Sequence, residues 1–433
     1  MNILVLDGSP EGDLTGARVA GILKELFSER GWQTEHVVLS NRTLGSCTGC
    51  FQCWLKTPGL CVIDDDGRLL AGKFIQSDLV VLLTPVTFGV YSPELKRLLD
   101  RLIPNVSPFF SMVDGEMHHK RRYAAYPGIL TIGWQEGQNE TEERIFRNLS
   151  YRNSINFYSE KYGCGIIEST ASEPDIRKHL KSLLPAVESA ATGSPEKLPR
   201  FSISETGSPV RKALLLVGSP RMGKSTSASL GEYLLGRLRQ KGVATETIHI
   251  YQVARNPEKT AKMLKAVDVA DLALLAFPLY IDSLPAPVIA AMRQIHEYRH
   301  GRPVHGGLTA IANCGFIEST HNENALAACA AFASASGFHW TGGISIGGGE
   351  GLVHGHPLGE LGGTVIPYRK NLDRVAESLA EGNPVPEEPC RQLAKPFVPA
   401  WIYRLFGSVN WKKQAHRHGV LRKLDDKPYQ PQT

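Results

Sequence analysis

The chain of 433 residues contains the same pattern twice, and this repeat limits the possible folds more than any other feature. Residues 2–10 and 212–220 are each a short apolar run that ends in Gly-Ser-Pro. A helical pattern follows in each copy, over residues 17–29 and 226–241. An apolar run that enters a helix through a tight turn is typical of a buried parallel strand. The sequence therefore predicts one such strand–helix unit in each half of the chain.

Each half continues with further apolar runs. Residues 78–85 and 271–278 both end in proline, and the runs 128–133 and 308–315 follow them. Strands that alternate with helices predict βαβ units and a parallel sheet. We therefore expect two doubly wound α/β domains in tandem.

Composition suggests where these domains begin and end. We expect a first domain over 1–190, a linker rich in Pro, Gly and Ser over 191–210, a second domain over 211–380 and a tail over 381–433. The end of the tail, residues 401–423, mixes Arg and Lys with Trp, Tyr and Phe. Such a segment can lie on a membrane surface, but a terminus that packs as a clasp on its own protein is the commoner case.

The overall composition is that of a globular protein, with 42% hydrophobic and 21% charged residues. The net charge of +5 includes no dense basic run before the tail, so nucleic acid is not an expected partner. Met1 leads directly into an apolar strand without a signal peptide, and no run approaches the roughly 18 apolar residues of a transmembrane span. We expect a cytoplasmic protein, in which clustered cysteines are more often metal-binding or catalytic than disulfide-bonded.

Half of the eight cysteines lie within the fifteen residues 47–61. Cys47, Cys50, Cys53 and Cys61 are spaced so that their sulfurs can converge on one iron–sulfur cluster or zinc ion. The first half is longer than the second between its Gly-Ser-Pro turn and its next strand, and this segment supplies the excess. The sequence therefore predicts a cysteine-bearing insertion on a repeated domain.

The second Gly-Ser-Pro turn also matches a nucleotide-binding pattern. Residues 218–225 fit the P-loop motif G-x4-G-K-[ST]. Pro220 removes an N–H group from the expected phosphate cradle, and no later strand ends in an Asp for Mg²⁺, so both features oppose an NTPase. Hydroxyls and N–H groups at a helix N-terminus can instead bind an FMN phosphate without magnesium, or the hydroxyls can be simple helix caps.

Three motifs together resemble the iron–sulfur flavoprotein branch of the NAD(P)H:FMN reductases, which have a flavodoxin-like fold. They are the first Gly-Ser-Pro turn, the cysteine segment followed by Asp64–Asp66, and residues 84–101, which read Thr-Pro-Val-Thr-Phe-Gly-Val-Tyr-Ser-Pro-Glu-Leu-Lys-Arg-Leu-Leu-Asp-Arg. The second half resembles the plain FMN reductase domain through residues 277–287, Phe-Pro-Leu-Tyr-Ile-Asp-Ser-Leu-Pro-Ala-Pro. The resemblance implies two flavodoxin-like sheets of strand order 2-1-3-4-5.

The resemblance also implies FMN at the carboxyl ends of the strands, NAD(P)H as the reductant, and one 4Fe–4S cluster on the four cysteines. Zinc and redox-active free thiols remain alternatives for that segment. The implied FMN ligands are Ser9, Pro10, Thr15, Gly16, Pro85, Val86, Thr87, Phe88, Gly89, Ser219, Arg221, Ser225, Thr226, Ser227, Pro278, Leu279, Tyr280 and Ile281. Phe88 or Tyr91 would cover the flavin ring. The first phosphate loop contains Glu11 and Asp13, and the second half lacks a Lys and an Asp-Arg pair after its flavin loop. One half is therefore expected to have lost its flavin. We favour FMN in the first half, with a second site open.

No catalytic residue is identified, and His118 and His119, in a connection that we interpret as a loop, are the candidates. Lys96 and Asp100 are expected to form a surface ion pair. The expected function is an FMN-dependent oxidoreductase that passes electrons from NAD(P)H, or from a ferredoxin-like donor, to a quinone, a nitro or azo compound or an activated alkene. The alternative is an electron carrier or redox sensor without its own substrate. We expect a monomer with pseudo-dimeric halves or a homodimer.

Overall fold

The computed structural model describes residues 1–189, 194–253 and 256–430. The chain divides into two compact units. The first unit combines Met1–Leu198 with Arg404–Thr433, and the second unit is Pro199–Tyr403. The predicted tail is thus shared between the units, and residues 191–193 of the predicted linker lie outside the described residues.

The first unit is built on a five-stranded parallel sheet. Its strands are β1 (Asn2–Asp7), β2 (Gln33–Val38), β3 (Leu79–Pro85), β6 (Gly128–Gln135) and β7 (Tyr162–Glu168), in the order β2-β1-β3-β6-β7. In the central register, Val5 pairs with His36 on one side and with Val81 on the other. Because β4 and β5 form a separate hairpin, the parallel strands have the order 2-1-3-4-5, and the predicted topology is confirmed.

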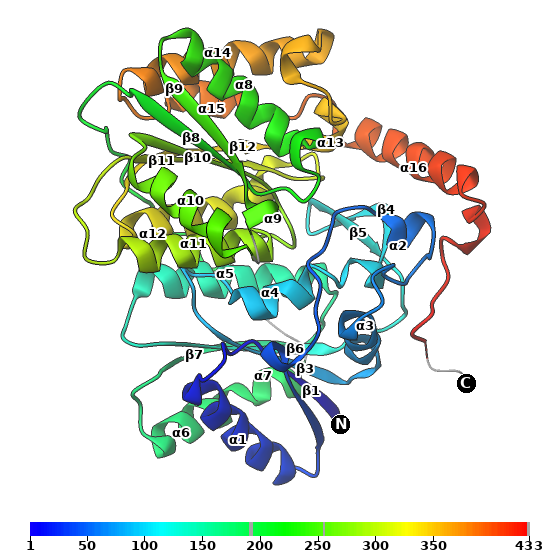
Figure 1. The fold of residues 1–433 in the computed structure, drawn as a ribbon. Coiled ribbons are helices and arrows are strands. Elements are labelled where there is room, and N and C mark those ends of the chain that lie inside the picture. Colours follow the sequence, from blue (N-terminus) through cyan, green and yellow to red (C-terminus); the bar gives the residue numbers. More distant parts are fainter. Residues whose placement is uncertain (190–193, 254–255, 431–433) are drawn as a thin grey trace. The chain divides into compact units, whose positions relative to one another are not determined.

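Helices cover both faces of this sheet (Figure 1). Helices α1 (Leu14–Ser28), α6 (Glu173–Leu183) and α7 (Pro185–Glu188) lie on one face, and α3 (Asp66–Gln76), α4 (Pro93–Leu99) and α5 (Glu140–Asn156) on the other. Short 3-10 turns are η1 (Leu39–Asn41) and η2 (Ile103–Asn105). Val19, Leu23 and Leu26 recur at helical spacing, so they lie on one side of α1 and pack against the apolar strands to form the core.

The second unit repeats this architecture. Its strands are β8 (Lys212–Val217), β9 (Ala244–His249), β10 (Leu272–Pro278), β11 (Gly307–Asn313) and β12 (His339–Ile346), in the order β12-β11-β10-β8-β9. Its helices are α8 (Thr226–Gln240), α9 (Ile250–Val253), α10 (Pro257–Asp268), α11 (Ala286–Arg299), α12 (Glu323–Ala335), α13 (Gly349–Val353), α14 (Ile366–Ala380) and α15 (Glu387–Leu393). The 3-10 turns are η3 (Met222–Lys224), η4 (Ser319–Asn322), η5 (Leu358–Glu360) and η6 (Gly363–Val365). Read from β9, the order is again 2-1-3-4-5.

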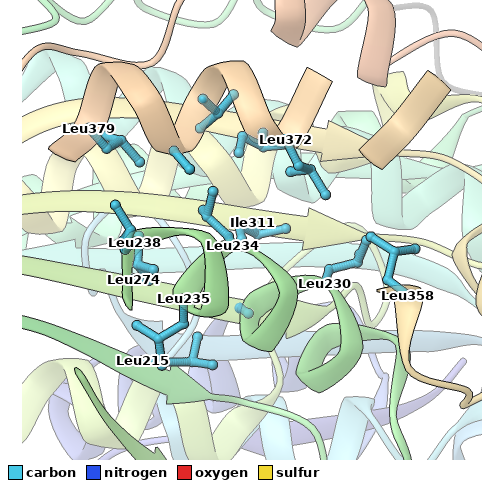
Figure 2. Close-up of a cluster of buried hydrophobic side chains, with 14 of the residues drawn as sticks. Leu215, Leu230, Leu234, Leu235, Leu238, Leu274, Ile311, Leu358, Leu372 and Leu379 are labelled. Atoms are coloured by element: carbon cyan, nitrogen blue, oxygen red, sulfur yellow. The ribbon is translucent and has the colours of Figure 1, made fainter. Parts of the chain in front are cut away.

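One hydrophobic layer of the second unit lies between its sheet and two helices. Figure 2 shows Leu234 and Leu238 of α8 close to Leu372 and Leu379 of α14, with Ile311 of the sheet beside them. All five side chains are almost completely buried. The packing holds α8, the helix that follows the second Gly-Ser-Pro turn, between the sheet and α14.

The first unit departs from the repeat in two insertions. The cysteine segment contains only the short helix α2 (Gln52–Leu55). A hairpin of β4 (Val106–Val113) and β5 (Glu116–Arg121) precedes β6, so our interpretation of the region around His118 and His119 as a loop is wrong. The two strands pair because Asp114 and Gly115, both with positive φ, form the tight turn between them.

The chain ends with α16 (Ala400–Arg417) and the 3-10 turn η7 (Leu421–Lys423). Within the part of the chain that the structure describes, no helix has both the length and the apolar character needed to cross a membrane.

Candidate functional site

The Gly-Ser-Pro turn of the first unit is capped by an acidic side chain. Asp13 Oδ1 accepts hydrogen bonds from the N–H groups of Thr15 (2.8 Å) and Gly16 (3.3 Å), and its Oδ2 accepts one from Trp134 Nε1 (3.0 Å). These N–H groups are the ones that a phosphate would use at a helix N-terminus. A fixed carboxylate already occupies them, with Glu11 in the same turn, so these residues do not fit a phosphate.

The predicted ligand Ser9 is also engaged within the protein. Its N–H and hydroxyl both bond to Asp7 Oδ1, and His36 Nε2 lies 2.9 Å from Asp7 Oδ2. Burial would raise the pKa of Asp7, but the hydrogen bonds from His36 and Ser9 outweigh burial and hold this pKa below its ordinary value. A Cβ on Gly16 would lie 1.8 Å from Ser9 Oγ, so the turn requires glycine there. The network is a closed structural cluster.

The corresponding turn of the second unit has the opposite charge. It carries Arg221 and Lys224 and no acidic residue, and the neutral hydroxyl of Ser225 caps α8 by accepting from the N–H of Ala228 (3.1 Å). The first-turn N–H groups of α8 have no partner within the helix. Together with the Ser219 hydroxyl and the two cations, they form a donor set that fits a phosphate dianion.

Two predicted hydroxyl ligands of this turn hold it in place instead of facing outward. Thr226 and Ser227 are buried. Thr226 Oγ1 donates to the carbonyl of Gly349 (3.4 Å), and Ser227 Oγ accepts from Asn313 Nδ2 (2.8 Å). Arg221 also pairs with Glu350 (2.9 Å). The glycine-rich residues after β12 therefore lie against the turn.

A second turn of unusual geometry follows the central strand in both units. Phe88 and Gly89 have φ of 55° and 78°, and Ile281 and Asp282 have 50° and 51°. In each unit the flanking residues form an antiparallel bridge, Thr87 with Val90 and Tyr280 with Ser283. Two consecutive residues with positive φ define a type I′ turn, and a β-branched residue there is strained. Strained turns cluster at functional sites. Both loops that were expected to contact the flavin have such a defined, strained backbone geometry.

Side chains anchor these turns differently in the two units. In the first, Glu142 Oε2 accepts from the N–H of Gly89 (3.0 Å), while the N–H of Val86 donates to the carbonyl of Trp134 (2.9 Å). Burial raises the pKa of Glu142, and the N–H groups of Gly89 and Phe88 partly oppose this rise. The N–H groups of Val86 and Gly89, two of the expected FMN ligands, are thus bonded to protein.

The second unit pairs side chains at the same place. Asp282 Oδ1 lies 3.2 Å from Nδ1 of His321, and both residues are buried. In the first unit, Tyr91 is buried in the core with its hydroxyl accepting from Asn153 Nδ2 (3.0 Å), so Tyr91 is a core residue here.

The four clustered cysteines lie close to one another. Burial raises the pKa of the Cys47 thiol to about 12, and Cys61 and Cys50 are near enough to raise it further. Burial and the other three thiols likewise raise the pKa of Cys53. None of the eight cysteines, all of which lie within the described residues, forms a disulfide bond. Among the residues that the structure describes, no three His, Cys, Asp or Glu side chains are arranged to hold a metal ion. Four neighbouring thiols are a ligand set that suits a soft metal centre. Their side chains are not, however, arranged around a common metal position in this structure.

One buried arginine fixes the ends of the cysteine segment. Arg101 donates to Asp65 Oδ1 (2.7 Å) and Oδ2 (2.8 Å), and to the carbonyls of Gly45 (2.9 Å) and Ile63 (3.1 Å). Asp65 in turn accepts from the N–H of Gly45 (2.8 Å). Burial would raise the pKa of Asp65, but the bonds from Arg101 dominate and lower it. These contacts join both flanks of the segment to the end of α4.

The insertion also explains an incorrect prediction. Lys96 and Asp100 form the expected ion pair, but both side chains are buried rather than on the surface. Asp100 lies close enough to Cys47 to affect the pKa of its thiol. The cysteine segment therefore lies close to the C-terminal end of α4.

The C-terminal segment of the first unit packs on the cysteine segment. Trp411 of α16 contacts Phe51 (ring centroids 5.4 Å apart) and Trp54 (5.2 Å), both edge-on. Arg122 donates to the carbonyls of Leu424 (2.9 Å) and Asp426 (2.7 Å). Trp54 is completely buried between these elements, and its indole donates to the carbonyl of Val106 (3.0 Å). The tail residues are thus part of the thiol site.

The two candidate histidines belong to this packing. His118 is buried, with Nδ1 3.1 Å from Asn156 Oδ1. His119 Nδ1 lies 3.1 Å from the carbonyl of Ser107, and its ring is 4.9 Å from that of Trp54. The structure thus brings His119 toward the cysteine segment.

These features define two flavodoxin-like α/β units, one with a basic turn at the N-terminus of α8 and one with a thiol cluster. The sequence model of the NADPH-dependent FMN reductases matches residues 1–159 and 211–340, more than half of the chain, so the chain belongs to this family and carries its pattern twice.

The chain is also similar to named relatives. It is 33% identical over 103 residues to an iron–sulfur flavoprotein of Methanosarcina thermophila, covering 24% of this chain and 53% of that protein. It is 33% identical over 104 residues to one from Methanocaldococcus jannaschii, covering 24% and 53%. The chain thus spans about half the length of these curated relatives. A crystal structure of an azoreductase from Bacillus anthracis matches 39% of this chain and 98% of its own, with 14% identity and a TM-score of 0.30.

Several site residues were not predicted. Glu142, Arg101, Arg122 and Trp411 act through contacts that join distant parts of the sequence, and no local pattern marks them. The sequence did indicate the acidic cap, because the carboxylate of Asp13 in a phosphate loop would repel a phosphate.

Proposed function

We propose that the protein is an FMN-dependent oxidoreductase that holds the FMN phosphate in the second unit, at the turn formed by residues 218–227. The observation that carries this proposal is the charge reversal between the two equivalent turns: Arg221 and Lys224 in the second, Glu11 and Asp13 in the first. The sequence had favoured the first half. The fixed carboxylate of Asp13 on the helix N-terminus supports the second half instead.

The chain's own residues would bind and orient the cofactor. First-turn N–H groups of α8 and the Ser219 hydroxyl would bind the phosphate, with Lys224 and Arg221 balancing its charge. The rigid turn Tyr280–Ser283 would position the flavin ring at the carboxyl end of β10. FMN, when bound, accepts a hydride and returns electrons in steps of one or two. We propose NAD(P)H as the reductant and a quinone, nitro or azo compound or activated alkene as the acceptor.

A specific observation favours a second element of this function. Cys47, Cys50, Cys53 and Cys61 are mutually close, and Cys53 is buried beside Trp54 and Trp411. We propose that these thiols hold a 4Fe–4S cluster, since four thiolates are its usual ligand set. Such a centre would exchange single electrons with a ferredoxin-like partner. If electron exchange at this cluster were the protein's only activity, the protein would be an electron carrier or redox sensor without a small-molecule substrate.

The test starts with protein purified without oxygen, in which FMN, non-haem iron and acid-labile sulfide are counted per chain. We expect one FMN, with about four irons and four sulfides. Cys50→Ser should remove the iron, whereas Cys390→Ser, outside the segment, should retain it. Zinc without sulfide, or neither metal, would refute the cluster while leaving the flavin proposal intact.

A matched pair of variants tests the location of the flavin. Lys224→Ala should weaken FMN binding about tenfold through loss of a charged contact to phosphate. Asp13→Ala, at the equivalent turn of the first unit, should leave FMN binding unchanged. The opposite result would place FMN in the first unit. Steady turnover of NAD(P)H with a quinone would separate the enzyme from an electron carrier, and no bound flavin at all would refute the proposed function.

A further inference from the structure

Helix α16 exposes an apolar row that neither the flavin site nor the thiol site uses. The exposed fractions are 68% for Trp401, 56% for Leu405, 68% for Phe406 and 55% for Val409. Trp401, Leu405 and Val409 are four residues apart and therefore lie on one side of the helix. A different row, with Trp411 and the buried Ala415, packs on the cysteine segment. The helix is thus fixed by one side while it presents large apolar side chains on another.

The same segment carries the positive charge of the whole chain. Residues 396–424 contain six Lys and Arg residues and no Asp or Glu. The rest of the chain has 42 basic and 43 acidic residues, so the net charge of +5 originates entirely from this segment. The basic residues are Arg404, Lys412, Lys413, Arg417, Arg422 and Lys423. Exposed Trp, Phe and Leu on a helix with only positive charge are the combination that anionic lipid surfaces recognise.

We propose that α16 docks the protein on the surface of a membrane that contains anionic lipids. Trp401, Leu405 and Phe406 would enter the boundary between headgroups and acyl chains, where Trp is especially favoured. The basic residues would contact lipid phosphates. Because no described helix can cross a membrane, this contact is peripheral.

The observations favour lipid over other occupants. A second copy of the chain would bring two wholly positive segments together, which costs electrostatic energy. Nucleic acid would match the charge, but exposed Leu405 and Val409 would gain nothing from a phosphate backbone. An acidic protein surface is the remaining alternative, and the vesicle experiment distinguishes it because it requires no protein partner.

The experiment is flotation of the full-length chain with vesicles of phosphatidylcholine containing roughly one third phosphatidylglycerol, compared with pure phosphatidylcholine. We expect binding at least tenfold stronger to the anionic vesicles, and loss of that preference at about 1 M salt, where the Debye length is near 3 Å. Lys413→Gln with Arg417→Gln should weaken binding about fivefold for each charge removed. Lys24→Gln with Lys259→Gln removes the same charge elsewhere on the surface and should have a smaller effect.

The apolar contribution has its own matched control. Leu405 and Leu69 are exposed to 56% and 58%, so Leu405→Ser and Leu69→Ser remove similar apolar surface. Only Leu405→Ser should reduce vesicle binding, with unchanged thermal unfolding of both variants. No vesicle binding, equal binding to both lipids, or equal effects of the two serine variants would overturn the proposal. Retention on heparin without vesicle binding would likewise overturn it and assign the charge to a soluble polyanion.

Discussion

Replacing Arg101 with leucine tests how the cysteine segment is held. Arg101 is 1% exposed and makes four hydrogen bonds of 2.7–3.1 Å, two of them to Asp65 and two to carbonyls at the ends of the segment. Leucine fills a similar space but leaves the Asp65 carboxylate buried without its cation. Removing one partner of a buried ion pair costs about 3–5 kcal/mol. Because about 1.4 kcal/mol is a factor of ten, local opening of the segment should become roughly 100- to 4,000-fold more frequent.

Thiol reactivity measures this opening directly. In metal-free protein, Cys53 is 6% exposed and should react with a thiol reagent only when the segment opens. We expect Arg101→Leu to accelerate this reaction on the order of a hundredfold or more. The matched control is Arg177→Leu, which removes an exposed ion pair with Glu25 and Glu29 in the same unit and should change stability by less than about 1 kcal/mol.

A double variant separates charge from packing. Asp65→Leu with Arg101→Leu replaces both partners by apolar groups, which is often close to neutral for a buried pair. The double variant should therefore recover part of the protection that Arg101→Leu loses. If Arg101→Leu left Cys53 as protected as Arg177→Leu does, the segment would be held by other contacts, and the reasoning would fail.

Two further predictions concern the same region. The folded-state pKa of Asp65 is lowered, so its stabilisation is present above the ordinary carboxyl pKa and is lost as the pH falls through the lower folded value. Melting temperature measured against pH should show this acid loss in the unaltered protein and less of it in Asp65→Asn. Trp411→Ala removes the ring that contacts Phe51 and Trp54 and should destabilise the tail by about 2–4 kcal/mol. Limited proteolysis should then cut α16 faster, while Trp401→Ala, an exposed indole on the same helix, should not change the rate.

The repeated architecture could be predicted because it depends on local patterns. Runs such as residues 79–83 are completely apolar, as is typical of a strand buried on both faces of a parallel sheet. The hairpin β4–β5 escaped prediction because its strands carry polar and aromatic residues on a partly covered surface. His118 and His119 look like loop residues in sequence, and their pairing with Ser111 and Phe110 becomes evident only in three dimensions.

The site was predictable where chemistry is concentrated in one segment. The four cysteines could be identified from their spacing in the sequence. The role of Arg101 could not, because it depends on contacts with Asp65 and Gly45, which are 36 and 56 residues away. The same limit explains the error at Lys96 and Asp100. Their spacing predicts a pair, but burial depends on which distant segment covers the helix.

The divergence of the two units has a physical basis in their covalent connection. In a symmetric homodimer every subunit has the same sequence, so each would need a phosphate-binding turn and a cysteine segment at once. In a tandem chain, the carboxylate of Asp13 can cap one helix while the neutral hydroxyl of Ser225 caps the equivalent helix without adding a negative charge. Likewise, the cysteine segment can grow in one copy only, where Trp411 and Arg101 stabilise it. A chain that separates the two tasks in this way should carry one flavin and one thiol centre, not two of each.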